Sequence, residues 1–418
     1  MLNRLKTYWT KSCLDWNYIF REELRTCLKD PGVLIFFLLV PLAYPLLYSF
    51  IYTREVVREV PVVVVDDSQS SLSRRYLRHI DATADVRLMA HCANMEEART
   101  LMRQCDAYGI IYIPESFSRD LNRHQQTSVR IYPDMSGLLY YKALLVANTE
   151  VSLAMNANIK VKRSANTTEQ EDKFTEHPIA YAEVSIFNPQ NGFAAFLIPA
   201  VLVLIIQQTL LLGVGMSAGT AREHNAFRHL IPIDKHHIGL LRIVFGKAAA
   251  YLLIYIPIAV YVFGVVPHMF SLNQIGAPTD LLLFLIPYII ACIFFAMTVS
   301  GLVSHRETCI ILVVFSSVLL LFISGVSWPG SAIPEWWRYI SYLFPSTFGI
   351  NGFVRINNSA ATLTEVQNVW WALWWQATAY FFLSAVVYRS AIRSARKSVL
   401  KKWQQLRNKK AKLARSEM

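Results

Sequence analysis

The stretch "FAAFLIPAVLVLIIQQTLLLGVGM", Phe193–Met216, is apolar except for Gln207, Gln208 and Thr209 near its middle. About 20 mostly apolar residues in a helix are enough to cross the ~30 Å hydrocarbon core of a bilayer. Backbone groups have no water to bind in that core, and a helix satisfies them within its own chain. The stretch therefore predicts a membrane-spanning helix.

Other apolar runs of similar length occur along the chain. Hydrophobic residues make up 54% of the 418 residues and charged residues only 17%, which is more apolar than a typical soluble domain. The fold class is therefore expected to be a polytopic α-helical membrane protein with six transmembrane helices. The expected spans are Gly32–Tyr52, Phe193–Met216, Ile243–Val266, Leu281–Val303, Thr308–Val326 and Val369–Tyr388.

The long interval between the first two spans, residues 53–192, has a different pattern. Short strand-like runs alternate there with amphipathic helical stretches, and this pattern is typical of a mixed α/β domain. Strands are expected at Val60–Asp67, 85–91, Tyr108–Pro114 and 127–134, with one long helix from Met135 to about Asn166. The sequence thus predicts an inserted extracytoplasmic α/β domain.

Lys and Arg residues concentrate in residues 1–31 and in the tail 389–418. Such residues are retained on the cytoplasmic side of a membrane, so both termini are expected to be cytoplasmic in a multi-pass protein of the inner membrane. The formal net charge of +12 then reflects topology and not nucleic-acid binding. The basic tail is expected to lie as a helix on anionic lipid, and Lys247 to reach toward lipid phosphate.

Signatures of catalysis are missing from the sequence. A phosphate-binding loop of the form G-x-x-x-x-G-K-[ST] does not occur, because Gly246-Lys247 is followed by Ala248. His236 and His237 are adjacent and would point about 100° apart on a helix, which does not suit a zinc site. We therefore expect neither an enzyme nor a directly bound cofactor or metal.

Three motifs carry a resemblance to a known family. They are "FREELRTCLKDPGVLIFFLLVPLAYPLL" (Phe20–Leu47), "REHNAFRHLIPI" (Arg222–Ile233) and "SGVSWPGSAIPEWWRYISYLFPSTFGINGF" (Ser324–Phe353). The chain resembles the permease subunit of an ABC-2-type ABC exporter, of the subgroup with a large extracytoplasmic domain after the first transmembrane helix. The third motif is the most specific, through Trp328, Pro329, Pro334, Trp336, Trp337 and Pro345.

The resemblance implies the function and the partners. It implies a permease that exports its substrate outward, with ATP and Mg bound by a separate ABC ATPase subunit. A hydrophobic or amphipathic substrate (drug, lipid or glycolipid) is compatible with apolar spans that lack fixed charge. The resemblance further implies a second permease copy, in a homodimer or heterodimer, and contact with membrane lipid. A periplasmic adaptor or membrane fusion protein is a further expected partner, whereas nucleic acid is not.

The resemblance also implies site residues. Residues 1–31 are similar to the family's interfacial helix, and residues 327–350 to its external re-entrant segment. Residues 220–242 resemble the segment that couples to the ATPase, with Arg222, Glu223, Phe227, Arg228, Leu230 and Pro232 as the contacting residues. The family often has Gly-Thr where this chain has Asn225-Ala226, so finer contacts do not carry over.

Several alternatives remain open from the sequence. Gln207 and Gln208 either form helix-to-helix hydrogen bonds or line a translocation path or dimer interface. The segment 327–350 could instead be an aromatic belt on an ordinary loop. The chain as a whole could be a membrane-anchored sensor or regulatory protein with an external ligand-binding domain.

Overall fold

The computed structural model describes residues 2–53, 56–163, 186–188, 192–223 and 240–416, with backbone alone for 2–12, 163 and 394–416. The chain divides into two compact units. One contains Met1–Thr53 and Ser185–Met418, and the other contains Arg54–Val184.

Within the described residues, five helices are long and apolar enough to cross a membrane. Two of them are built from shorter pieces: α2 (Pro31–Leu34) leads through a π-helical turn into α3 (Val40–Ile51), and α11 (Leu240–Val260) leads similarly into α12 (Val266–Met269). The five candidate spans are Pro31–Ile51, α9 (Phe193–Glu223), Leu240–Met269, α13 (Pro278–Val299) and α14 (Arg306–Ile323).

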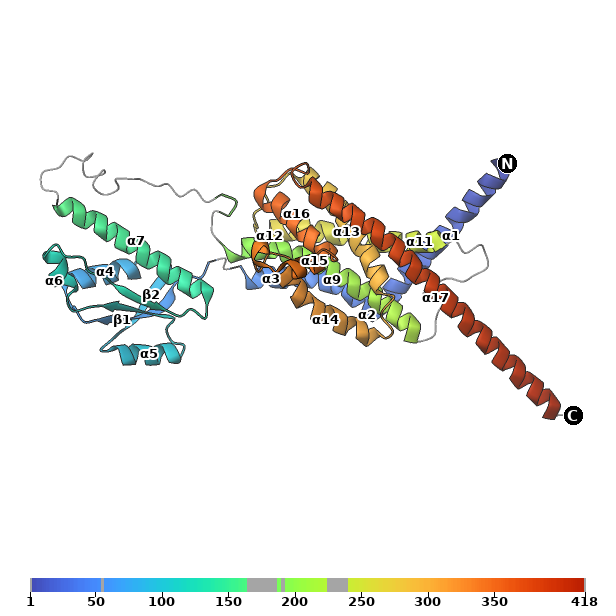
Figure 1. The fold of residues 1–418 in the computed structure, drawn as a ribbon, viewed down its shortest axis with the longest axis horizontal. Coiled ribbons are helices and arrows are strands. Elements are labelled where there is room, and N and C mark those ends of the chain that lie inside the picture. Colours follow the sequence, from blue (N-terminus) through green and yellow to red (C-terminus); the bar gives the residue numbers. More distant parts are fainter. Residues whose placement is uncertain (1, 54–55, 164–185, 189–191, 224–239, 417–418) are drawn as a thin grey trace. The chain divides into compact units, whose positions relative to one another are not determined.

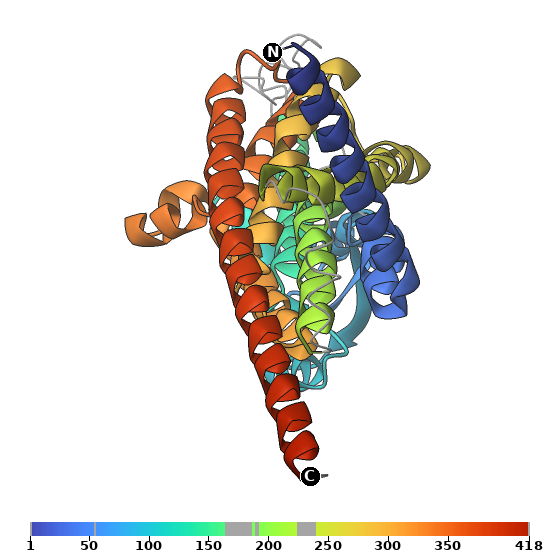
Figure 2. The same ribbon diagram turned by 90° about the vertical axis from the view of Figure 1, so that its right-hand side faces the viewer.

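The expected span Val369–Tyr388 is not among these five. It forms part of α17 (Gln367–Ser416), a single helix of 50 residues that Figure 2 shows as an unbroken rod. Its apolar half contains several Trp and Tyr residues together with Gln376, and these side chains make it less hydropathic than the other spans. The described helices therefore support five candidate spans where six were expected.

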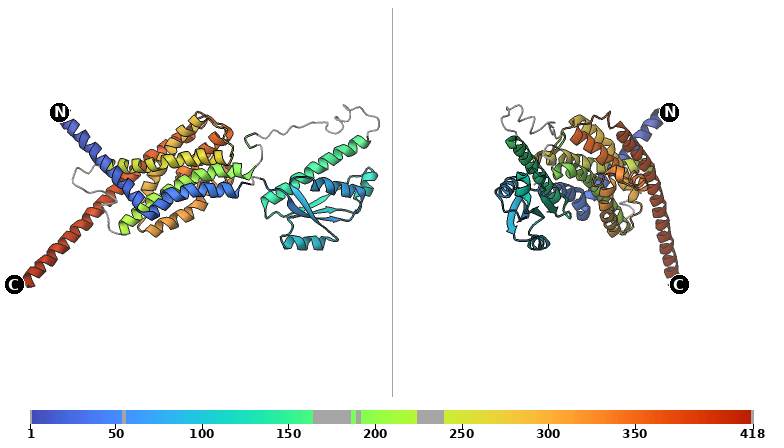
Figure 3. Two further views of the ribbon diagram at one scale, coloured as in Figure 1. Left: turned by 180° about the vertical axis from the view of Figure 1, so that it is seen from behind. Right: turned by 60° about the vertical axis from the view of Figure 1, so that its left-hand side comes forward.

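The spans differ in how deeply they are enclosed. The apolar window of α9 is 83% buried, against 22% for both Pro31–Ile51 and α14. Figure 3 shows α3 running beside α9. The helical unit thus has α9 at its centre and two helices, α3 and α14, with large faces open to lipid or to another chain.

The remaining helices of this unit flank the spans. Helix α1 (Leu2–Lys29) precedes the first span and packs along α11. Two helices, α15 (Glu335–Ser341) and α16 (Pro345–Ser359), lie between α14 and α17. Helix α16 packs on α9 and α13, so it belongs to the core of the unit.

The other unit is a mixed α/β domain built on four strands in the order β2-β1-β3-β4. Strand β1 (Val60–Asp66) pairs in parallel with β2 (Val86–Cys92) and β3 (Gly109–Ile113), and β4 (Arg130–Pro133) is antiparallel to β3. These positions confirm the four expected strands. The long helix expected near residues 135–166 is α7 (Leu138–Arg163).

Helices cover both faces of this sheet. Figure 1 shows α4 (Ser71–Asp81) and α7 on one face and α5 (Met95–Arg103) on the other. A short helix, α6 (Phe117–Asn122), packs beside α4. The buried valines of β1 alternate between the two faces, with Val62 and Val64 facing α4 and α7, and Val63 and Val65 facing α5.

Candidate functional site

The C-terminal end of α9 binds the connection between α13 and α14. Arg222 donates from Nη1 to the carbonyl oxygen of Ser300 at 2.8 Å and also to that of Val303. Glu223 Oε1 accepts the backbone N–H of Arg306 at 2.6 Å, the first residue of α14. These side chains therefore satisfy backbone groups that helix ends leave unpaired. We call Arg222, Glu223 and Arg306 the α9 clamp.

The clamp extends to the beginning of the first span. The Arg306 guanidinium lies 3.1 Å from Asp30 Oδ1. Asp30 also caps α2, because Oδ1 accepts the N–H groups of Gly32 at 2.9 Å and Val33 at 3.3 Å. Gly219 permits the close approach of α9 to α14, since a Cβ there would lie 2.9 Å from the backbone nitrogen of Arg306. The clamp thus joins α9, α14 and α2.

The residues predicted for ATPase coupling fall into two groups. Arg222 and Glu223 lie in the clamp and bind other parts of this chain. Phe227, Arg228, Leu230 and Pro232 lie in 224–239, outside the described residues. The predicted coupling segment, residues 220–242, therefore includes the end of α9 with the clamp residues Arg222 and Glu223, and it ends in the first turn of α11.

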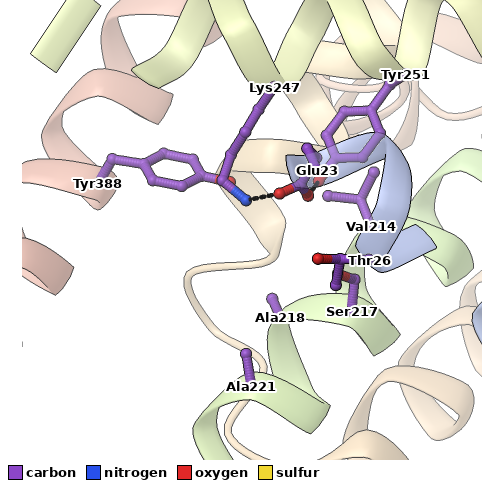
Figure 4. Close-up of a pocket in the computed structure, with 9 residues that line it drawn as sticks. All are labelled: Glu23, Thr26, Val214, Ser217, Ala218, Ala221, Lys247, Tyr251 and Tyr388. Atoms are coloured by element: carbon purple, nitrogen blue, oxygen red, sulfur yellow. Dashed lines mark hydrogen bonds and ion pairs between the residues drawn. The ribbon is translucent and has the colours of Figure 1, made fainter. Parts of the chain in front are cut away.

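A buried charge cluster lies where α1 meets α11 (Figure 4). Lys247 Nζ and Glu23 Oε2 form an ion pair in which each side chain is only 3% exposed. The other oxygen of Glu23 accepts the hydroxyl of Tyr251. The Lys247 ammonium also lies 6.0 Å from the centre of the Tyr388 ring. Removing such a pair from water costs free energy, and the attraction between the two charges offsets that cost only when their geometry is close to ideal.

This cluster corrects the expectation that Lys247 reaches toward lipid phosphate. Helix α1 lies along α11 and supplies a carboxylate, so Lys247 turns into the protein. Further contacts hold the same alignment: Asp15 pairs with Arg242 at 2.7 Å, and a Cβ at Gly246 would lie 2.9 Å from Ile19. In the sequence, this contact of α1 with α11 was indicated only by the four-residue spacing of Asp15, Ile19 and Glu23, which places them on one helix face.

Small side chains surround the cluster. A cavity of about 10 Å³ is lined by Thr26, Ser217, Ala218 and Ala221 together with the cluster, which is about the space that one water molecule needs. Burial and the nearby Glu23 carboxylate raise the pKa of the Cys27 thiol well above its usual value. Cys27 is therefore neutral at physiological pH, and a neutral thiol is a poor nucleophile.

Gln207 forms a hydrogen bond between helices. Its Oε1 accepts the backbone N–H of Ser346 at 2.6 Å, in the first turn of α16. Nearby, the Tyr288 hydroxyl donates to the carbonyl oxygen of Val203 at 2.6 Å. The Gln207 Nε2, in contrast, has no hydrogen-bond partner among the described residues.

Gln208 has a different environment from its neighbour. It lines a cavity of about 320 Å³ whose other walls come from α3 and α14, including Tyr44, Tyr48 and Val313. Gln208 is 7% exposed, and neither its amide nitrogen nor its oxygen has a hydrogen-bond partner among the described residues. The site is therefore a mostly apolar cavity whose wall contains the Gln208 amide and a few hydroxyl groups.

The proline residues of segment 327–350 lie at helix starts, whereas Trp328 lies in a turn and Trp336 and Trp337 lie within α15. Pro334 precedes α15, and Pro345 begins α16. Pro329 precedes a short 3₁₀ turn. Trp328 and Trp336 are each 58% exposed. The Trp337 ring stacks on that of Trp336, with centroids 4.4 Å apart.

Within the described residues, no group of three or more His, Cys, Asp or Glu side chains could hold a metal ion. The comparison with curated proteins gave no match. A family model described as "ABC-2 family transporter protein" matches residues 31–388. Because this match covers most of the chain, the chain belongs to the ABC-2 family of transporter membrane proteins.

Proposed function

We propose that this chain is the transmembrane permease subunit of an ATP-driven exporter that moves a hydrophobic or amphipathic molecule outward. The ABC-2 membrane permease is a non-catalytic transport subunit, and such permeases typically pair with an ATPase subunit. Free energy must then reach the spans through contact between subunits. The observation that carries the proposal is the α9 clamp, which offers a route for that contact.

The ATPase docks on residues 220–242, with Phe227, Arg228, Leu230 and Pro232 as its contacts. A displacement of this segment acts directly on the end of α9. Through Glu223 and Arg306 it also acts on α14, and through Asp30 it acts on α2. These helices belong to the spans that line the cavity at Gln208, so rigid-body movement of the segment changes the shape of the cavity.

The substrate class follows from the cavity. Its walls are mostly apolar, with hydroxyl groups from Tyr44, Tyr48, Thr209 and Ser317, and Gln208 supplies an amide that has no hydrogen-bond partner among the described residues. Pockets of this kind bind apolar molecules and orient them with a few polar contacts. A drug, lipid or glycolipid with one hydroxyl or carbonyl near an apolar region fits this chemistry.

A second permease copy covers the open faces of α3 and α14. The α14 face exposes Val314, Phe315, Val318 and Phe322. The cavity at Gln208 lies between these two helices, so pairing there places the cavities of both copies at the dimer interface. Both a homodimer and a heterodimer satisfy this arrangement.

Helix α17 forms the sixth span in this proposal. Trp370 Nε1 donates to the carbonyl oxygen of Leu283 at 3.1 Å, and the carbonyl oxygen of Tyr380 accepts from Thr298 at 3.1 Å. Leu283 and Thr298 lie near opposite ends of α13, so α17 accompanies α13 along its length. An even number of spans then puts both termini on the cytoplasmic side of the inner membrane, as the Lys and Arg distribution favours.

The α/β domain is extracytoplasmic in this topology, where it engages a periplasmic adaptor. The basic residues 389–416 continue α17 as a helix. They therefore extend the last span on the cytoplasmic side, toward anionic lipid headgroups and the ATPase.

Purification of the native complex tests the proposal. A tagged chain extracted in mild detergent should bring down a nucleotide-binding subunit that hydrolyses ATP. Phe227→Ala should lose that subunit. The matched change Phe382→Ala, at an exposed position of α17 outside the proposed dimer interface, should retain it. Recovery of the chain without any nucleotide-binding partner would refute the proposal.

A further inference from the structure

The turn between α15 and α16, Ser341–Ser346, is bound by side chains from other helices, and we call it the hairpin tip. Gln376 Nε2 donates to the carbonyl oxygen of Tyr342 at 2.6 Å, and the Tyr380 hydroxyl donates to that of Leu343. On the opposite side, Gln207 accepts the N–H of Ser346 at 2.6 Å. The tip is therefore held by α17 on one side and by α9 on the other.

The hairpin tip lies half-way along α9. Gln207 is near the middle of that helix, whereas Asn358, near the end of α16, donates to the carbonyl oxygen of Ala195 in the first turn of α9 at 3.1 Å. Helix α16 thus runs antiparallel to the first half of α9. Its N-terminus lies at the depth of the hydrocarbon core, if α9 crosses the membrane.

A helix N-terminus at that depth needs partners within the protein, because no bulk water reaches it. Pro345 has no N–H to satisfy. The N–H of Thr347 reaches the carbonyl oxygen of Phe344 at 3.1 Å. The N–H of Ser346 is left for Gln207, whose side chain is fully buried. Gln207 thus provides the non-local acceptor in this turn.

We propose that Gln207, Gln376 and Tyr380 form a polar socket that fixes the hairpin tip, so that α15 and α16 move with α9 and α17 and not as a separate lid. Close packing agrees with this assignment. A Cβ at Gly349 would lie 2.3 Å from the Tyr288 ring, and one at Gly352 would lie 2.2 Å from the Phe284 ring. Helix α16 is therefore fitted onto α13, which leaves α3 and α14 as the movable walls of the cavity.

The three socket residues are positioning residues. Their role in deciding which helices move during transport rests on the proposed export function. The stability of the socket itself can be measured in membranes without any transport or ATPase assay. A failure of the socket is therefore distinguishable from a failure of the proposed function.

Cys292 is a native reporter of the socket. Its side chain is fully buried, with Sγ 4.0 Å from Gln207 Oε1. Its alkylation by N-ethylmaleimide in membranes, quantified by peptide mass spectrometry, reports how often this region opens. Gln207→Met keeps the side-chain length and removes the acceptor for Ser346. Loss of a buried partner should raise the alkylation rate about 5- to 150-fold, which corresponds to about 1–3 kcal/mol.

The adjacent Gln208 supplies a matched control. Gln208→Met makes the same chemical change in the cavity. It should leave the Cys292 alkylation rate within about twofold of wild type, since Gln208 has no hydrogen-bond partner to lose within the part of the chain that the structure describes. Gln207→Glu keeps an oxygen acceptor. Burial without a counter-ion favours the protonated, neutral carboxyl, and in that form the variant should restore most of the protection that Gln207→Met removes.

Two results would overturn the socket. One is an alkylation rate in Gln207→Met equal to wild type, and the other is an equal increase in Gln207→Met and Gln208→Met. If Gln207→Met does not accumulate in the membrane, Tyr380→Phe serves as the test variant, because it removes only the hydroxyl bound to Leu343. Tyr380→Phe should then raise the Cys292 alkylation rate over the same range, and a rate equal to wild type or equal to that of Gln208→Met would overturn the socket.

Discussion

Removal of one partner from the Glu23–Lys247 pair should destabilise the helical unit strongly. Lys247→Met preserves much of the side-chain length but leaves the Glu23 carboxylate buried without its counter-ion. Breaking a buried ion pair in this way costs about 3–5 kcal/mol. The hydroxyl of Tyr251 still donates to Glu23, so we expect a loss near the lower end, about 3 kcal/mol.

The double variant Glu23→Gln with Lys247→Met removes both charges. Neutral replacement of a buried pair is often close to neutral in stability, so the double variant should recover at least about 2 kcal/mol of the loss. Denaturant unfolding of the purified chain in detergent, followed by tryptophan fluorescence, measures each member of the cycle.

The Asp15–Arg242 pair is the control for this cycle. It joins the same two helices, but its side chains are 23% and 12% exposed. Solvent screens a partly exposed pair, so Asp15→Asn should cost about 1 kcal/mol or less. A loss below about 1 kcal/mol for Lys247→Met, or a double variant as unstable as the sum of its single variants, would refute the assignment of a tightly coupled buried pair.

Three further variants test the clamp, the cavity and the packing. Glu223→Ala removes the acceptor for the N–H of Arg306, so reconstituted vesicles should export less per ATP hydrolysed while co-purification still recovers the ATPase subunit. Gln208→Leu removes an unpaired buried amide, so denaturant unfolding should show a gain of about 1–3 kcal/mol while export in the same vesicles falls. Gly213→Ala places a Cβ 2.3 Å from the Phe37 ring, and overpacking of this kind should cost about 1–3 kcal/mol in denaturant unfolding.

Local sequence patterns predicted the elements of this fold but not their contacts. Phe193–Met216 was recognisable because an apolar run is a property of consecutive residues. The contacts of Lys247 and Gln207 could not be recognised in this way, since their partners lie 224 and 139 positions away in the sequence. Glu23 is one of several charged residues before the first span. Only the packing of α1 along α11 selects it as the partner of Lys247.

The neighbouring residues Gln207 and Gln208 illustrate the same limit. Their side chains are chemically identical, and the sequence assigned both the same two alternatives. Successive residues on a helix point about 100° apart, so one faces α16 and α13 while the other faces α3 and α14. The neighbouring helices decide which of the two glutamines finds a hydrogen-bond partner. Those helices are distant in the sequence, so the local pattern does not contain this information.

A cross-link between α9 and α14 tests whether these helices move against each other during transport. A Cβ at Gly215 would lie 3.5 Å from the Cβ of Cys309, a separation that suits a disulfide. Gly215→Cys should therefore form a disulfide with the native thiol of Cys309 under mild oxidation.

If α14 is a movable wall of the cavity, this disulfide should stop export in reconstituted vesicles, and a reductant should restore it. Wild-type protein, which has Cys309 alone at this contact, should be unaffected by the same oxidation. Export that continues at the wild-type rate after complete cross-linking, verified by mass spectrometry, would contradict the movement of α14. The clamp would then hold α14 rigidly on α9, and α2 and α3 would have to supply the opening of the cavity.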